Sequence, residues 1–436
     1  MRTSFPVACA AMTLAANCLL STPAASAQQP IDEPTHVRVA RLIDRLGDED
    51  FARRAAADEE LARLGSQARE QLQRATESED TEVRVRAQAL LWKLKVADLW
   101  VSAPVEFTET TIPASRVFAE LARQTGNPLL VGDNYGKFSD TPVTLAESGA
   151  FWQVLDEVCR QSGNAARPHY DTRQPGLVVT EGDLGQFPLA YAGPVRAQVT
   201  GATRLFTEEL DYRDLDRDQT HTFQIKIKLM WEDRFRLVAY REQPELLSAV
   251  TDTGVALSAG KPSAEGWNSL SRGTQQVSCT LKLEPPPVAA RQLDELAVAW
   301  PMIAVGELAV MDVDDLDDGR THYQHDAQLQ IVQVEKQSDR QVSVTLRVTR
   351  DLVVPDPQEI LFQENEFELF DAQGRAYRKQ GQTTTLTDGG AQFKINFLGR
   401  DASEPKSLRF TYPRIRSRRD LRITFRDVPL PTGRPL

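Results

Sequence analysis

The sequence contains little histidine and cysteine, the side chains that most often carry proton transfer, nucleophilic attack and metal binding. It has five histidines in 436 residues, and none stands in the His-Glu-x-x-His pattern of zinc peptidases. Of its four cysteines, only Cys159 and Cys279 lie beyond residue 20. Small secreted domains that depend on disulfides for stability contain more cysteines than this, so we expect both to be buried free thiols. A disulfide between them is the alternative.

An excess of positive charge is also missing. The formal net charge is −11, with 62 acidic and 51 basic residues. Binding to nucleic acid needs a basic footprint that neutralises phosphates. The composition therefore argues against nucleic acid as the main partner.

The familiar catalytic patterns are absent as well. The chain has no Gly-x-Ser-x-Gly elbow, no Gly-x-Gly-x-x-Gly and no Walker motif. Ser-x-x-Lys occurs at Ser258–Lys261 and Ser403–Lys406, but without the Ser-Asp-Asn and Lys-Thr-Gly elements that accompany it in penicillin-interacting enzymes. The acidic run Asp312–Asp318 has Leu316 where a calcium loop needs an oxygen ligand, so it offers at most a weak calcium site. We predict no catalytic residue, no cofactor and no metal site.

Long apolar runs are confined to the start of the chain. Met1-Arg2 precedes the mostly apolar stretch Val7–Leu20, and Ala25-Ser26-Ala27 has the small-x-small form of a cleavage site. These features predict a signal peptide over residues 1–27 and a mature start near Gln28. No later segment is apolar enough for a transmembrane helix. We therefore expect export to the periplasm, the cell envelope or the outside of the cell.

Residues 28–100 show helical periodicity. Val39, Leu42, Ile43 and Leu46 have the spacing of one helix face, and three further apolar stripes follow, beginning at Phe51, Ala68 and Val83. Four short helices in hairpins fit this pattern. The segments Phe51-Ala52-Arg53-Arg54-Ala55, Leu64-Gly65 and Glu82-Val83-Arg84-Val85-Arg86-Ala87 resemble HEAT-type repeats, over residues 36–96.

A pentapeptide occurs twice in the next stretch, residues 101–183. Arg123-Gln124-Thr125-Gly126-Asn127 returns as Arg160-Gln161-Ser162-Gly163-Asn164, each time at the end of an amphipathic run. Each run lies between two short extended segments, so the pattern predicts a duplicated strand–helix–strand unit. Gly126 and Gly163 are predicted to be structural helix stops in the left-handed conformation that glycine adopts readily.

This stretch resembles the short N-terminal domain shared by secretins and TonB-dependent outer-membrane receptors. The matching residues are Ile112-Pro113, Pro142-Val143-Thr144-Leu145, Trp152-x-Val154-Leu155-Asp156 and Gly163. The resemblance implies a two-helix, small-sheet module that meets periplasmic partners through exposed strand edges and helix faces.

From residue 184 onward the pattern favours strands. Phe223, Ile225, Ile227 and Leu229 alternate with polar residues, and so does the series from Val342 to Val348. Both series are followed by an Asp-containing glycine turn, Asp252–Gly254 and Asp371–Gly374. We predict two related antiparallel sandwiches of the Ig-like type, over residues 184–318 and 319–436. The prolines at 285–287 mark another place where the boundary between them could lie.

The strongest local concentration of one charge is in residues 409–426. Five arginines are the candidate binding residues here: Arg414, Arg416, Arg418, Arg419 and Arg422. Alternation of charged with apolar residues is also what a strand with one solvated face needs. The alternative is a basic surface for an anionic partner, because guanidinium groups suit carboxylate or phosphate.

Together these patterns predict a multi-domain α+β protein with N-terminal α-helical hairpins, a small α/β two-helix domain and two C-terminal antiparallel sandwiches. We expect an exported, non-catalytic protein of the cell envelope that acts by contact with an envelope protein or a glycan. Two alternatives stay open. One is an accessory subunit of an outer-membrane transport or secretin-like assembly, and the other is an envelope hydrolase whose site no sequence pattern reveals.

Overall fold

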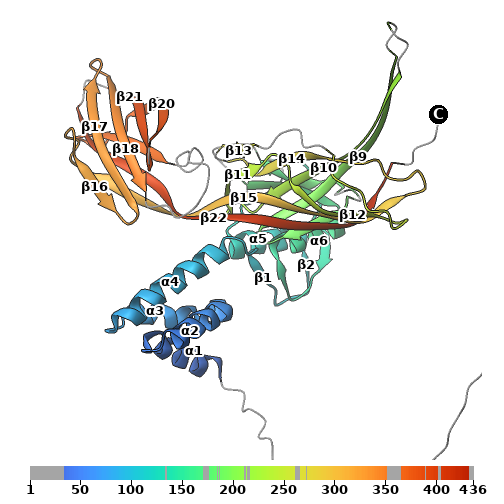
Figure 1. The fold of residues 1–436 in the computed structure, drawn as a ribbon, viewed down its shortest axis with the longest axis horizontal. Coiled ribbons are helices and arrows are strands. Elements are labelled where there is room, and N and C mark those ends of the chain that lie inside the picture. Colours follow the sequence, from blue (N-terminus) through green and yellow to red (C-terminus); the bar gives the residue numbers. More distant parts are fainter. Residues whose placement is uncertain are drawn as a thin grey trace, which may run out of the picture. The chain divides into compact units, whose positions relative to one another are not determined.

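The computed structural model describes most of the chain after its N-terminal segment. The described residues are 34–132, 135–169, 176–183, 185, 187–210, 213, 217–260, 266–271, 273–350, 365–387, 389–400 and 404–431. The predicted signal peptide, residues 1–27, lies outside them. They belong to two compact units, Met1–Leu91 and Trp92–Leu436. The chain is a mixed α+β protein whose C-terminal part is rich in antiparallel sheets (Figure 1).

The first unit consists of short helices. They are α1 (Thr35–Asp44), η1 (Arg45–Gly47), α2 (Phe51–Leu64), η2 (Gly65–Ala68), α3 (Arg69–Ala75) and the first part of α4 (Thr81–Asp98). Asp50 caps α2 by accepting a hydrogen bond from the backbone N–H of Ala52 at 2.8 Å. The apolar stripes read from the sequence form the core, through Val39, Leu42, Leu46, Leu61, Leu72, Ala87 and Leu90. Among all described helices, none is long and apolar enough to cross a membrane.

Phe51 is an exception to the predicted helical stripe. Its side chain is 69% exposed, although the apolar spacing placed it on the buried face. Phe51 is the first residue of α2, so no preceding turn of the helix covers its ring. The guanidinium of Arg54 lies 5.8 Å from the ring centroid instead.

A small module of two helices and short strands follows α4. Its elements are β1 (Pro104–Glu106), β2 (Thr111–Pro113), α5 (Ala114–Thr125), β3 (Leu129–Val131), β4 (Pro142–Thr144), β5 (Ser148–Ala150), α6 (Phe151–Ser162), β6 (Asn164–His169) and β7 (Gly176–Glu181). Both helices and the four strands expected from the sequence are present. The two halves exchange strands, because β1 pairs with β5 and β2 pairs with β4. The apolar faces of α5 and α6 meet in one core around Phe118, Phe151 and Leu155.

Two facing sheets form a sandwich-like body after the small module. The first sheet has the order β14-β10-β9-β8, with β8 (Leu189–Ala192), β9 (Val195–Leu210), β10 (Arg217–Trp231) and β14 (Gln276–Leu283). Its partner contains β11 (Arg236–Arg241), β12 (Glu245–Thr251), β13 (Trp267–Ser269) and parts of β15 (Gln292–Val313) and β22 (Pro405–Pro429). Phe223, Ile225, Ile227 and Leu229 are fully buried between the sheets, as their alternation predicts.

A second body repeats this arrangement. Its first sheet has the order β16-β17-β18-β21-β20, with β16 (Thr321–Gln324), β17 (Ala327–Lys336), β18 (Gln341–Arg350), β20 (Arg378–Thr387) and β21 (Gly390–Leu398). The facing layer is β19 (Glu366–Asp371) with the other parts of β22 and β15. The order β21-β18-β17-β16 matches β14-β10-β9-β8. The predicted turns also match, because Gly254 and Gly374 have φ of 77° and 71° and donate to the carbonyls of Thr251 and Asp371.

The two bodies share their longest strands. β15 and β22 pair over nearly their whole length, from Gln292 opposite Pro429 to Val313 opposite Leu408, with interruptions at Asp294 and Glu307 (Figure 1). Residues 421–430 lie in the core of the first body, and residues 309–313 lie in the core of the second. The first core is therefore completed by the C-terminal end of β22, and the second core includes residues that precede the predicted domain boundary at residue 318.

Candidate functional site

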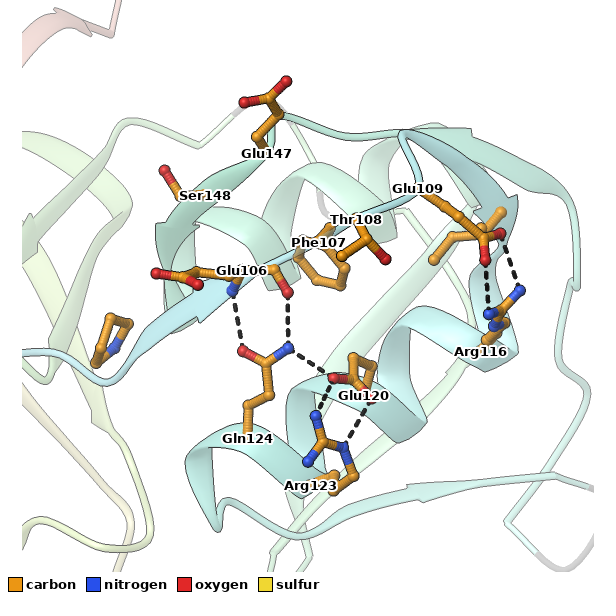
Figure 2. A pocket seen from close by; sticks show the side chains of 12 residues that line it. Glu106, Phe107, Thr108, Glu109, Arg116, Glu120, Arg123, Gln124, Glu147 and Ser148 are labelled. Atoms are coloured by element: carbon orange, nitrogen blue, oxygen red, sulfur yellow. Dashed lines mark hydrogen bonds and ion pairs between the residues drawn. The ribbon is translucent and has the colours of Figure 1, made fainter.

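An open groove lies in the small module between β1 and α5 (Figure 2). Its volume is about 1050 Å³. β1 and the loop after it form one wall, α5 forms the other, and Glu147 and Ser148 extend the wall of β1. A strand and a helix that face each other across a groove offer backbone and side-chain contacts to the same partner.

The side chain of Gln124 bridges the groove wall at the end of α5. Its Oε1 accepts from the backbone N–H of Glu106 at 2.9 Å, and its Nε2 donates to the carbonyl oxygen of Glu106 at 2.7 Å. A neighbouring β-strand makes the same pair of hydrogen bonds with its backbone. The side chain of Gln124 thus occupies the backbone N–H and carbonyl of Glu106, to which an added strand could otherwise hydrogen-bond.

The groove carries both paired and unpaired acidic side chains. Arg116 forms a two-pronged ion pair with Glu109, at 2.9 and 3.0 Å, and Arg123 pairs with Glu120. The hydrogen bonds from Arg123 and Gln124 lower the pKa of Glu120 to about 2. Among the described residues the carboxylates of Glu106 and Glu147 have no such partner. In Figure 2 the dashed lines at Glu106 end on its backbone, and none ends on either carboxylate. The groove is therefore net acidic.

The second copy of the pentapeptide makes the same contacts on another strand. Gln161 exchanges two hydrogen bonds with the backbone of Thr144 on β4, both at 2.8 Å. Glu157 pairs with Arg160 and accepts from Gln161 at 2.7 Å. Sequence reading recognised the pentapeptide but not these partners. The shared Glu three residues before each Arg was the available signal.

The last residues of each pentapeptide end a helix and anchor the chain beyond it. Gly126 and Gly163 follow α5 and α6 with φ of 70° and 69°, in the left-handed conformation. Asn164 binds the backbone of Ser139 with both ends of its amide, at 2.8 and 3.1 Å. Asn127 instead contacts Glu232, a fully buried residue after β10. The asparagine of the first copy thus contacts the neighbouring sandwich, whereas the asparagine of the second copy contacts a loop of its own module.

A buried ion pair and the hydrogen bonds of a buried glutamate fix the small module to the first sandwich. The Asp156 and Arg196 side chains are 2% and 5% exposed, with 2.6 Å between Oδ2 and Nε. The hydroxyl of Tyr191 donates to the same carboxylate at 2.8 Å. Glu232 accepts from the Ser102 hydroxyl at 2.6 Å and from Arg234 Nε at 2.6 Å. The groove therefore belongs to a firmly attached element.

The structure divides the five predicted arginines of β22 between two faces. Arg414 forms an ion pair with Glu307, with 2.6 Å between Nη1 and Oε1, and its guanidinium lies over the ring of Trp92. Arg419 points to the other face, over Trp100. Arg416, Arg418 and Arg422 alternate on one strand and share the outer face of the sheet.

Two arginines that sequence reading missed join this face from β11. Arg236 lies in register with Val305 of β15, which lies in register with Arg416. Arg241 and Arg418 both lie over the ring of Trp267, at 5.6 and 5.3 Å. We call this set, Arg236, Arg241, Arg416, Arg418 and Arg422 around Trp267, the basic face. Only strand pairing through β15 brings β11 and β22 together, so no local sequence signal marks it.

The cysteines and the acidic run considered in the sequence analysis line neither the groove nor the basic face. Cys159 and Cys279 are buried free thiols, and burial raises the pKa of each to about 12. In the acidic run, Asp312 pairs with Arg409 at 2.7 Å and Asp315 with Arg320 at 3.1 Å. Across the described parts of the chain, His, Cys, Asp and Glu form no group of three that would hold a metal ion.

Comparison with known proteins adds no relative to this picture. The chain matches no family model, no curated protein and no solved structure.

Proposed function

We propose that this chain is an exported, non-catalytic protein of the cell envelope that acts by contact, and that the groove between β1 and α5 receives an extended segment of a partner protein. The observation that carries the proposal is the groove itself, an open volume of about 1050 Å³ beside a strand whose backbone, at Glu106, already donates one strand-like hydrogen bond and accepts another. Addition of a strand to an exposed edge is a common mode of peptide recognition.

Binding would replace the Gln124 amide by a partner backbone. The N–H and carbonyl of Glu106 would keep their hydrogen bonds, so the exchange leaves no buried polar group unpaired. The unpaired carboxylates of Glu106 and Glu147 favour lysine or arginine on the incoming segment. The partner is thus an extended stretch with basic residues.

The module resemblances support the same role. We propose that residues 101–183 are a secretin-type short N-terminal domain, that residues 36–96 are HEAT-like and that the two sandwiches are Ig-like. The exchange of strands between two helix-containing halves, the helical hairpins and the repeated strand order are the supporting observations. All three module types serve mainly in protein contact, although fold does not by itself define function.

Site-specific crosslinking tests the groove. A photoreactive amino acid at Ser148 is expected to capture a discrete envelope protein, whereas the same group at exposed Asp339 in the second sandwich should not. Changing Glu106 and Glu147 to lysine should abolish the Ser148 adduct. Capture that survives this charge reversal would contradict the proposal, and recovery of a secretin or receptor would favour the transport-assembly alternative.

Export has a separate test. Amino-terminal sequencing of the protein from its native cells is expected to begin near Gln28. A protein that retains residues 1–27 would contradict export by a cleaved signal.

A further inference from the structure

The two long strands pair irregularly where they pass from one sandwich body to the other. The chain enters the second body along β15 and returns along β22. The pairing of these strands is regular on both sides of Glu307 and Arg414 but skips these two residues. Glu307 also has a φ of 46°, a conformation that residues with a side chain rarely adopt. Backbone outliers of this kind concentrate where a protein switches or bends.

This interruption lies between two separate cores. β15 contributes residues up to Ala304 to the core of the first body and residues from Ala309 onward to the core of the second. The other interruption in the pairing, at Asp294, is flanked by Leu293 and Leu296, which both lie in the first core. Of the two interruptions, the one at Glu307 can therefore change its angle without disturbing the side chains packed within a core.

The C-terminal half of α4 binds the strands at this interruption. Lys95 Nζ lies 2.7 Å from one carboxylate oxygen of Glu307, and Arg414 Nη1 lies 2.6 Å from the other. The guanidinium of Arg414 also lies over the ring of Trp92, 5.4 Å from its centroid. The hydrogen bond from Lys95 lowers the pKa of Glu307, so the carboxylate stays charged at neutral pH.

An apolar contact accompanies the ion pairs. Leu99 follows α4 directly and lies against Gly306, where an added Cβ would come within 2.5 Å of Leu99 Cδ2. Trp92, Lys95 and Leu99 have the i, i+3, i+7 spacing of one helix face, so the end of α4 meets the interruption with a single stripe. The Lys95 and Glu307 side chains are 46% and 30% exposed. Salt weakens ion pairs that are exposed to this degree, so this contact is one that can open.

We propose that Glu307 and Arg414 form a hinge between the two sandwich bodies, and that α4 is the latch that holds the hinge in one position. While the latch is closed, two cations bind Glu307 and the second body keeps one orientation. When it opens, the second body turns about β15 and β22. The hinge is independent of the groove beside β1, because none of its residues lines that groove.

The distance distribution between two spin labels tests the hinge. The labels are attached to p-acetylphenylalanine at exposed Ser278 in the first body and at exposed Asp339 in the second, so the native thiols are not used. The chain from Gln28 should give one dominant distance by double electron–electron resonance. E307A should raise the share of other distances about fivefold or more, because it removes both ion pairs. Identical distributions for E307A and the parent chain would overturn the proposal.

D312A is the matched control. Asp312 forms an ion pair with Arg409 at 2.7 Å between the same two strands, and these residues stand opposite each other where the pairing is regular. Their side chains are 57% and 44% exposed. We expect D312A to leave the distribution unchanged. Equal broadening by D312A and E307A would indicate general loosening of the strands and would refute a hinge at Glu307.

Salt and a milder variant complete the test. Raising NaCl to about 1 M shortens the Debye length to about 3 Å, so it should broaden the distribution of the parent chain and change that of E307A little. If circular dichroism shows that E307A is unfolded, K95A replaces it, with a smaller shift in the same direction because Arg414 still binds Glu307. A parent distribution that is as broad at low salt as that of the variant would refute the latch.

Discussion

The ion pair between Asp156 and Arg196 is expected to dominate the attachment of the small module to the first sandwich. Replacing Arg196 with methionine removes the guanidinium but leaves the Asp156 carboxylate 2% exposed, with the Tyr191 hydroxyl as its remaining donor. Breaking one side of a buried ion pair typically costs about 3–5 kcal/mol. We expect R196M to lower the free energy of unfolding by that amount.

The size of this effect follows from burial. Arg160 and Glu157 form an ion pair on the same helix, α6, but their side chains are 58% and 44% exposed. Exposed pairs contribute about 0–1 kcal/mol because water and salt screen them. R160M is therefore the matched control, with an expected loss below about 1 kcal/mol.

Urea unfolding followed by tryptophan fluorescence measures both variants, since Trp152 lies beside the pair, with the Arg196 guanidinium 5.9 Å from its ring. A double variant, D156L/R196M, should be less destabilised than the sum of its single changes, because neither charge is then left buried alone. Equal losses for R196M and R160M, or strict additivity in the double variant, would refute this explanation.

The other predictions concern backbone, fragments, thiols and pH. G163A should lower the free energy of unfolding by about 1–2 kcal/mol through backbone strain alone, since an added Cβ has no atom within 4 Å. G193A should lower it by more, because its Cβ would lie 2.0 Å from the Trp100 carbonyl oxygen. Thermal unfolding of both variants measures this difference. A fragment of residues 305–419 should fold, while 319–436 should not, because only the former keeps residues 309–313 in its core and omits the apolar strand end 421–430; circular dichroism separates the two. Cys159 and Cys279 should resist alkylation at pH 8 until denaturant is added. Burial shields both sulfurs, and a pKa of about 12 leaves almost no thiolate at that pH. Labelling of both thiols in the native chain would contradict this prediction. Glu120 should titrate with a pKa of about 2 by carboxyl NMR. Because this folded pKa lies below the ordinary value of 4.5, the stabilising contribution of Glu120 is present above pH 4.5 and is lost as the pH falls towards 2, and a titration midpoint near 4.5 would refute the contacts of Arg123 and Gln124.

Local patterns in the sequence determined the elements themselves. The spacing of Val39, Leu42 and Leu46 and the alternation of Phe223, Ile225 and Ile227 identified a helix and a strand, because each has a fixed side-chain period. The repeated glycines, Gly126 and Gly163, marked helix ends because few other residues adopt left-handed backbone at low cost. Such features depend on residues within one or two turns of each other. Phe51 shows the limit, since periodicity does not reveal that the first residue of a helix lacks a covering turn.

The partners of those elements were decided only by the tertiary structure. The pairing of β1 with β5, the passage of β15 and β22 through both sandwich cores, and the meeting of Arg241 with Arg418 over Trp267 all join residues far apart in the chain. Strand pairing is set by which apolar faces can be buried together, and that depends on the whole assembly of sheets. The sequence by itself therefore determined the modules and their order, whereas the groove and the basic face exist only because distant strands lie side by side.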